Sequence, residues 1–240
     1  MGRGRAGRRA VAGLDRVTAV TTQLPMFPLN TVLFPGAVIP LHVFEPRYRA
    51  LIAALLEQPD PTQRLLGTVG IREGYEVGDH GSQSLYRVGC RLQLVEVSAA
   101  ADGTYDIEVV ARDRIRLNQL DTSGDFPLGE VADLPEVDEE VPLPTVAAAV
   151  SAFVAYRSAI TQIRDDPFTG QLPTDPIYLS WTLAAAAPLP LPDRQTLLES
   201  DSAAERLALV TDLLRAEIRA MAVVPSLPAT DVARTRWSPN

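Results

Sequence analysis

The chain has 240 residues and a formal net charge of −8, with 46% apolar and 22% charged residues. These values are typical of a globular protein, and the length suffices for one large domain or two modest ones. All 22 basic residues are arginine. Arginine stays protonated, so chemistry that needs a lysine (a Schiff base, a Walker A lysine, a Ser-Lys dyad) is excluded for these residues.

The charge is unevenly distributed. Residues 1–23 carry five arginines against one acid, whereas the remaining residues carry 17 arginines against 29 acids, a net charge of −12. The first segment has no hydrophobic period, and we expect it to be a disordered Arg-rich tail. Because the rest is acidic, it repels phosphate backbones, and we expect no nucleic acid among its partners.

Localisation is predicted from the cysteine count and the apolar runs. Cys90 is the single cysteine, so no intramolecular disulfide can form, which fits a reducing compartment. We expect no signal peptide, because Asp15 and Arg16 interrupt the start, and no membrane partner, because Val141–Tyr156 is too short to span a bilayer. The prediction is a cytoplasmic protein.

Residues 24–134 have the pattern of a β-rich subdomain. Short apolar runs bounded by Pro, Gly and Asp-Gly predict strands. The expected strands are Leu24–Pro28, Val32–Phe34, Val38–Phe44, Leu65–Ile71, Tyr86–Val97, Tyr105–Ala111, Ile115–Leu120 and Leu128–Leu134. One helix is expected from Glu45 and Pro46 onward, with Tyr48, Leu51 and Leu55 on its apolar face. Glu73–Ser84 is predicted to be an exposed loop.

Beyond an acidic, Pro-bearing linker at residues 135–144, every periodic segment is helical. The expected helices are Thr145–Arg164, Asp175–Ala187, Pro192–Glu199 and Ser202–Met221. Ile177 and Trp181 are predicted to point inward, and Ser202 with Glu205 forms a capping box. The sequence therefore predicts an α+β fold with a helical subdomain at 145–222 and a frayed tail at 223–240.

The first predicted strands carry a family resemblance. Leu24–Gly36 (LPMFPLNTVLFPG) and Leu41–Tyr48 (LHVFEPRY) resemble the opening of the LON substrate-binding domain, which lies at the N-terminus of Lon proteases of peptidase family S16. The resemblance extends over about residues 24–222, and includes Gly67–Arg72, Val88–Cys90, Ala111–Leu117, Leu179–Trp181 and Ser202–Arg215. It implies a β-rich, PUA-like pseudo-barrel followed by a helical bundle, and recognition of substrate proteins without the ATPase and peptidase of Lon.

The most distinctive cluster gives the candidate site. The predicted peptide-binding residues are Phe34, Phe44, Glu45, Arg47 and Tyr48. The alternative is structural: Glu45 stands at a helix N-terminus, where a carboxylate is favoured, Arg47 pairs with it, and Tyr48 packs in the core. Both interpretations stay open at this level.

Other reactive residues are few. His42, His80 and Cys90 are far apart in the sequence and fall short of a usual zinc site, so we expect no metal and no cofactor. Cys90 is predicted to pack as a small hydrophobe. Glu136, Asp138, Glu139 and Glu140 form a charge run, which is typical of a solvated linker.

The predicted function is a non-catalytic module that binds unfolded or extended polypeptide, as an adaptor in protein quality control with a separate protease as a second partner. Proline-interrupted strands at sheet edges would offer backbone groups to such a peptide. The alternative is a small-molecule or enzymatic role in the cleft between the subdomains. An open apolar groove would favour the first, and a closed pocket with converging polar groups the second.

We predict that the purified chain does not degrade casein, with or without ATP, because lysine-dependent chemistry is excluded. The measurement is release of acid-soluble fragments, with a mock purification from the same host as the contaminant control. Sustained, ATP-stimulated degradation above that control would contradict the prediction.

Overall fold

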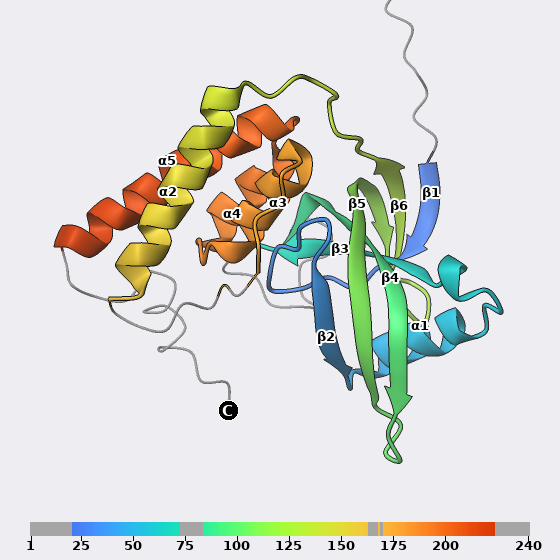
Figure 1. Ribbon diagram of the computed structural model, residues 1–240. Coiled ribbons are helices and arrows are strands. Elements are labelled where there is room, and N and C mark those ends of the chain that lie inside the picture. The colour runs from blue at the N-terminus through green and yellow to red at the C-terminus, as the bar shows by residue number, and fades with distance from the viewer. Residues whose placement is uncertain (1–20, 73–83, 163–167, 169, 224–240) are drawn as a thin grey trace, which may run out of the picture.

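The structure is a computed structural model that describes residues 21–72, 84–162, 168 and 170–223. Figure 1 shows the sheet with α1 on one side and the later helices on the other, an α+β arrangement as expected. The strands are β1 (Thr21–Pro25), β2 (Val38–Val43), β3 (Leu65–Ile71), β4 (Leu85–Ala99), β5 (Tyr105–Asp121) and β6 (Leu128–Asp133). The helices are α1 (Pro46–Leu56), α2 (Leu143–Ile160), α3 (Pro176–Ala186), α4 (Leu191–Glu199) and α5 (Ala203–Val223), with a short 3₁₀ turn at Pro61–Gln63.

The sheet closes on itself through the segment after β1. Its strands run in the order β1-β6-β5-β4-β3, and β2 joins β5 at the side. Met26 and Leu29 then form parallel bridges with Gly67 and Gly70 of β3, and the Phe27 amide donates to the Gly67 carbonyl at 2.8 Å. Both ends of the strand order are thus bound by one N-terminal segment, around a core that consists of Leu24, Met26, Val69, Ile71, Leu85, Ile115, Leu117 and Val131.

Strand β5 is longer than predicted. Tyr105–Ala111 and Ile115–Leu120 were expected to be separate strands, but they form one strand with a bulge. Cys90 pairs with Arg114 and Leu92 with Ala111, so Arg91 alone lies opposite two residues, Arg112 and Asp113. The prediction of two strands is wrong because the residues between them form a bulge, which bends a strand without ending it.

Two boundaries at the N-terminus also differ from the prediction. β1 begins at Thr21, earlier than Leu24, and the first residues of the described chain pair with β6. Val32–Phe34 is buried but is not a strand. Its carbonyls accept side-chain donors instead: Arg194 Nη2 lies 2.9 Å from the Val32 oxygen, and the Cys90 thiol lies 3.3 Å from the Leu33 oxygen.

Strand β2 lies at an edge, as its proline predicts. Among the described strands it pairs with β5 alone, from Val38 opposite Val110 to Val43 opposite Tyr105. Its side chains alternate, and Val38, Pro40 and His42 are exposed. Proline is tolerated here because an edge strand needs only one row of backbone hydrogen bonds.

The helices begin and end close to the predicted residues. α1 starts with Pro46 and buries Tyr48, Leu51, Ile52 and Leu55, and the Tyr48 ring stacks on Phe27 at 4.2 Å between centroids. At the start of α5 the Glu205 amide donates to Ser202 Oγ at 3.2 Å, and the Glu205 carboxylate accepts from the Asp201 amide at 2.9 Å. The predicted capping pair of Ser202 and Glu205 is therefore present, and only the bond back from Glu205 goes to the amide of Asp201 instead of that of Ser202. Residues 1–20 of the expected Arg-rich tail, the expected tail at 223–240 beyond residue 223, and nearly all of the expected loop at 73–84 lie outside the described residues.

Helix α2 is, in the described part of the chain, the one helix long and apolar enough to cross a membrane by length and composition. Its buried side chains, Ala149, Ala152, Phe153, Tyr156 and Ile160, belong to the main hydrophobic core. Helix α5 packs along it (Figure 1). The expectation that this segment is too short to span a bilayer is wrong for its length, and 28% of the helix is buried inside the protein.

We predict that Gly129→Ala destabilises the sheet core. A Cβ there would lie 2.7 Å from Met26 Cγ and 2.8 Å from Leu117 Cδ1, inside the ring of strands. Overpacking of this kind costs about 1–3 kcal/mol. Urea unfolding measures it, and Gly124→Ala is the matched control, since its Cβ meets only the Phe126 carbonyl at 3.8 Å. Equal stabilities for the two variants would contradict the packing argument.

Candidate functional site

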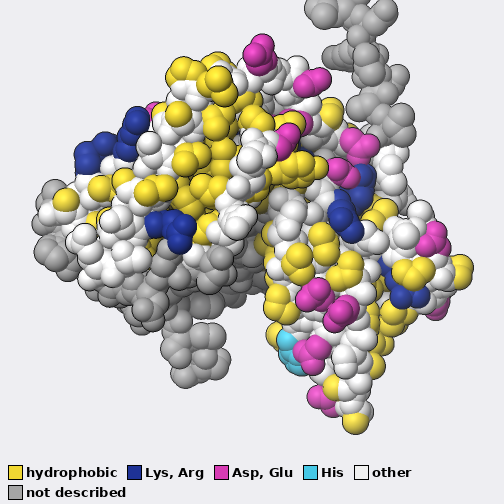
Figure 2. Space-filling model, in the orientation of Figure 1, with side chains coloured by type: hydrophobic (Ala, Val, Ile, Leu, Met, Phe, Trp, Pro, Cys, Tyr) yellow, Lys and Arg dark blue, Asp and Glu magenta, His cyan; other side chains and the backbone are white. Residues whose placement is uncertain are grey.

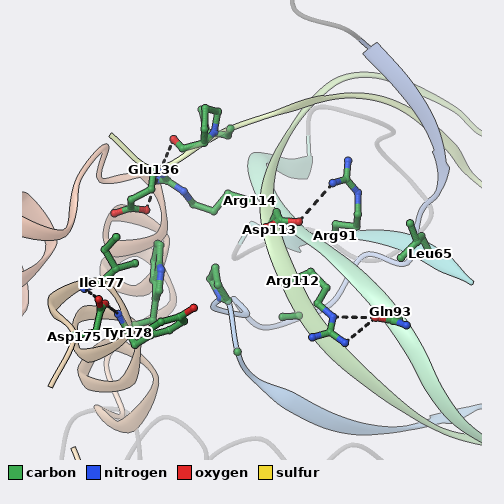
Figure 3. Close-up of a pocket in the computed structure, with 16 residues that line it drawn as sticks. Leu65, Arg91, Gln93, Arg112, Asp113, Arg114, Glu136, Asp175, Ile177 and Tyr178 are labelled. Atoms are coloured by element: carbon green, nitrogen blue, oxygen red, sulfur yellow. Dashed lines mark hydrogen bonds and ion pairs between the residues drawn. The ribbon is translucent and has the colours of Figure 1, made fainter. Parts of the chain in front are cut away.

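A groove separates the sheet from helix α3. Its main part has a volume of about 830 Å³. One wall comes from β4 and β5, the other from the start of α3, and the linker residues 134–136 lie at one end (Figure 3). The residues that line it are Pro35, Gly36, Leu65, Arg91, Gln93, Ala111, Arg112, Asp113, Arg114, Leu134, Pro135, Glu136, Asp175, Ile177, Tyr178 and Trp181.

A second hollow of about 580 Å³ continues the groove along α3. It shares Pro35, Gly36, Tyr178 and Trp181 with the first part, and its other lining residues are Ala37, Phe168, Pro173, Thr182, Ala185 and Ala186. Hydrophobic side chains gather over the helices and reach the boundary with the sheet (Figure 2). The two parts form one continuous groove with an apolar side.

The sheet side of this junction is a tight turn. The Ala37 amide donates to the Phe34 carbonyl at 3.1 Å, and Gly36 has φ of +88°. Proline followed by a glycine with positive φ is the sequence that a type II turn requires. The turn is fixed to β5, because the Gly36 amide donates to the Ala111 carbonyl at 2.9 Å. Its backbone position is therefore rigidly tied to the sheet.

The opposite wall is the first turn of α3. Asp175 caps this helix by accepting from the amides of Ile177 at 2.9 Å and Tyr178 at 3.1 Å. Trp181 is buried as predicted, at 6% exposure, but the prediction that Ile177 points inward is wrong, since it is 36% exposed. Tyr178 is 67% exposed. The start of α3 thus presents two large side chains to the groove and not to the core.

Below Trp181 lies a fully buried arginine. Arg206 is 0% exposed, and its guanidinium carbon lies 3.2 Å from the centroid of the Trp181 ring. The guanidinium donates to Glu136 Oε1 at 2.7 Å, to Ser180 Oγ at 2.7 Å and to the Leu197 carbonyl at 3.2 Å. Burial lowers the pKa of Arg206 to about 10, which leaves it charged at neutral pH.

A second buried arginine joins the same carboxylate from the sheet. Arg114 of β5 lies 3.4 Å from Glu136 Oε2 and donates to the carbonyls of Leu198 at 3.0 Å and of Ser200. Burial lowers the pKa of Arg114. These carbonyls are at the C-terminal end of α4, where the helix dipole favours a cation. One acid and one helix end therefore hold two arginines, from β5 and from α5.

The expectation that Glu136 belongs to a solvated linker is wrong. Its side chain is only 18% exposed, whereas the neighbouring Asp138, Glu139 and Glu140 are exposed as predicted. Arg114, Glu136 and Arg206 were not predicted as a group. For Arg206 the available signal was its position among the apolar, periodic residues of the last predicted helix, where an unpaired charge is rarely buried. Arg114 lies in a charged run (ARDRIRL), and nothing in the sequence distinguishes it from its neighbours.

The five predicted peptide-binding residues do not form one surface. Phe34 is 1% exposed and lies behind the groove, with its ring 6.0 Å from that of Trp181. Tyr48 is 4% exposed, in the core. Phe44, Glu45 and Arg47 lie together at the start of α1, beside a small pocket of about 200 Å³.

Glu45, Arg47 and Tyr48 at the start of α1 make the contacts expected if their role is to stabilise the fold. Arg47 Nη2 lies 2.9 Å from Glu45 Oε2, and the Arg47 guanidinium lies 4.6 Å from the centroid of the Tyr48 ring. Burial raises the pKa of the Tyr48 hydroxyl. Phe44 is 63% exposed and could contact a partner directly. The peptide-binding role of this cluster stays a prediction.

The remaining reactive residues have structural contacts. His42 Nδ1 lies 2.8 Å from Asp106 Oδ1 on the exposed edge of the sheet, and His80 lies outside the described residues. Cys90 is 0% exposed, and burial raises the pKa of its thiol to about 12, so it packs as predicted. In the described ranges no group of three or more His, Cys, Asp or Glu side chains could hold a metal ion.

Comparison with known proteins gives a consistent relationship. A family model described as the ATP-dependent protease La (LON) substrate-binding domain matches residues 23–216. Lon protease of Escherichia coli (strain K12) is 29% identical over 201 residues, or 82% of this chain and 25% of that protein. Lon protease 2 of Herpetosiphon aurantiacus is 30% identical over 211 residues, or 85% of this chain and 25% of that protein. The chain spans about a quarter of the length of these relatives.

Solved structures show the same fold. A Lon N-terminal domain protein from Xanthomonas campestris matches with a TM-score of 0.58 at 24% identity, covering 81% of this chain and 98% of that one. The N-terminal domain of Mycobacterium avium complex Lon protease matches with a TM-score of 0.57 at 20% identity and the same coverage. At these identities the likeness concerns the fold alone.

We predict that Glu136→Ala lowers the free energy of unfolding by about 3–5 kcal/mol, because it leaves two arginines buried without their carboxylate. Chemical denaturation measures the change. Glu139→Ala, an exposed acid of the same linker, is the control and should be neutral within about 0.5 kcal/mol. A similar small effect at both positions would show that Glu136 does not hold the network together.

Proposed function

Because the chain belongs to the LON substrate-binding domain family, as its residues 24–48 predicted, we propose that it is a polypeptide-binding module whose groove between the sheet and α3 receives extended segments of other proteins. The observation that carries this proposal is the shape of the groove. It is open to solvent, runs past both Pro35 and the first turns of α3, and is apolar on the helix side.

The α3 wall of the groove fits the side chains of an extended peptide. Tyr178 is largely exposed although it stands beside buried Trp181, and a tyrosine at such a place offers both apolar area and a hydrogen-bonding hydroxyl. Pro35 and Ala37 face this helix from the turn. Aromatic anchors next to well-packed neighbours carry most of the binding energy in protein interfaces.

The edge of the sheet offers backbone pairing to the same ligand. Ala37 lines the groove, and β2 begins at the next residue, Val38, which is 55% exposed. A peptide leaving the groove along this edge could add to β2 as a further strand, with alternate side chains on each face. Such contacts tolerate many sequences, and we expect a dissociation constant of roughly micromolar to millimolar, or about −8 to −4 kcal/mol.

A small-molecule or enzymatic role is the second candidate for this cleft. It would require polar groups that converge on a ligand. The three groove carboxylates already have partners: Glu136 binds Arg206, Asp175 accepts from the α3 amides, and Asp113 lies 3.7 Å from Arg91. This use of the polar groups favours the peptide over a small polar ligand.

The proposal extends to the subdomains, the location and the partners of the protein. We propose a PUA-like assignment for the closed sheet, a cytoplasmic location and an adaptor role beside a separate protease. The two subdomains, predicted at 24–134 and 145–222, are proposed to begin at Thr21 with β1 and at Leu143 with α2. A second location for the peptide is the exposed cluster at Phe44, Glu45 and Arg47.

Tyr178→Ser is predicted to weaken binding of an unfolded model polypeptide about ten-fold, the loss expected from removing an aromatic anchor. Phe44→Ser is the matched control, because it removes an aromatic ring of similar exposure from the other candidate surface. Titration of labelled, reduced and alkylated substrate into each variant measures the affinity, and thermal melting checks that both variants fold.

The outcome distinguishes the two surfaces. Loss of binding in Tyr178→Ser alone supports the groove, and loss in Phe44→Ser alone places the peptide at the start of α1. If wild-type protein fails to bind unfolded polypeptide at millimolar concentration, the peptide-binding proposal is wrong and the small-molecule alternative takes its place.

A further inference from the structure

The charges that line the groove are not equally satisfied. Asp175 is committed to the α3 cap, and Glu136 is committed to two buried arginines. Arg91 lies 2.7 Å from Asp133 Oδ1 and 3.7 Å from Asp113 Oδ2. Each of these groups has an opposite charge or a helix end as its partner.

Arg112 is the exception among the described groove residues. Its Nε and Nη2 both donate to Gln93 Oε1, at 3.0 and 2.7 Å, and no carboxylate of the described chain lies within salt-bridge distance of it. The Gln93 amide oxygen is neutral, so it orients the guanidinium without neutralising its charge. Figure 3 shows this pair on the sheet wall of the groove, across from Tyr178.

The bulge in β5 explains why this arginine stands free. Arg112 and Asp113 share one place in the ladder opposite Arg91, and the Asp113 carboxylate is directed to Arg91. Asp113 is thereby drawn away from its neighbour in the sequence (Figure 3). The groove is left with one arginine that has no carboxylate partner among the described residues, in a chain whose total charge is −8.

We propose that the groove selects polypeptide segments in which a carboxylate lies next to a large apolar side chain. The apolar side chain would pack against Tyr178 and Pro35, and the carboxylate would bind the Arg112 guanidinium, exchanging with or adding to the Gln93 amide. Arginine forms two parallel hydrogen bonds with a carboxylate, which are stronger than those to a neutral amide. This inference rests on the proposed peptide-binding function and names its ligand class.

The protein is negatively charged overall, so a preference for acidic segments would not be expected from its net charge. At long range an acidic segment is repelled, and only a local, desolvated contact can reverse that preference. If the groove recognised peptides by apolar contacts alone, it would instead favour neutral or basic apolar segments. The carboxylate can belong to an Asp or Glu side chain or to the C-terminus of a peptide, and these two sources present the same chemistry to Arg112.

The test uses four labelled peptides of the same length, each with one Phe-Leu pair. The first has an Asp beside that pair and an amidated C-terminus, the second has Asn in place of Asp, the third ends in a free carboxylate directly after the pair and contains no other acid, and the fourth is its amidated counterpart. Fluorescence anisotropy with the full chain gives each affinity at low and at physiological salt. We expect one or both carboxylate peptides to bind about five- to twenty-fold more tightly than their amide counterparts.

The variants assign the effect to Arg112. Arg112→Gln should lower the affinity for the carboxylate peptide to that of its amide counterpart and leave the amide peptide unchanged. Arg215→Gln is the control, since it removes an exposed arginine from α5, outside the groove. Thermal melting of both variants checks that they fold.

The measured affinities distinguish the inference from its alternatives. A gain for the Asp peptide, for the free C-terminus or for both identifies the source, provided that Arg112→Gln abolishes it. Equal affinities for carboxylate and amide peptides, with Tyr178→Ser still weakening both, would overturn the inference and leave the proposed function standing. A carboxylate preference that survives Arg112→Gln also overturns it. Failure of all four peptides and of unfolded polypeptide to bind would contradict the proposed function itself.

Discussion

The position of α3, and with it the groove, depends on the ion-pair network of Glu136 with Arg114 and Arg206. The network joins three parts of the chain that are distant in the sequence: the middle of β5, the linker and the start of α5. The Arg206 guanidinium also lies against the Trp181 ring, so the same charge that binds the linker fixes α3. Arg194 and Gln195 of α4 add side-chain hydrogen bonds to the carbonyls of Val32 and Val88 on the sheet side.

The buried network has one more positive charge than negative charge, because two arginines share the Glu136 carboxylate. Desolvating a charge costs several kcal/mol, and a single ion pair often fails to offset that cost. Here the last carbonyls of α4, at Leu197, Leu198 and Ser200, supply the missing acceptors at the negative end of a helix dipole. The arginines therefore specify where the end of α4 lies, because another packing of α4 would remove the carbonyl acceptors at Leu197, Leu198 and Ser200.

Local patterns predicted most of the elements, and the failures have physical causes. Periodicity and proline positions were enough for β2, β3 and α1, since these depend on short-range rules. The split of β5 was wrong because a bulge tolerates a charged run that resembles a turn. Val32–Phe34 was read as a strand because apolar, buried residues look alike whether their carbonyls bind a ladder or the side chain of Arg194. Ile177 was assigned to the core because hydrophobicity does not reveal which apolar positions of a helix face a groove.

The candidate site was harder to predict than the fold for the same reason. The Phe44–Tyr48 segment is distinctive in sequence, yet its Glu45, Arg47 and Tyr48 make contacts that build the start of α1. The groove has no local signature, because its walls come from Pro35, from Arg112 and from Tyr178, which only the folded chain brings together. What gives the groove its chemistry is a difference in partners: Glu136 pairs with buried arginines and Asp175 caps α3, whereas Arg112 has only an amide oxygen. The sequence does not show which charged side chains are paired. Only the hydrogen bonds of the folded protein show that Arg112 lacks a carboxylate partner among the described residues.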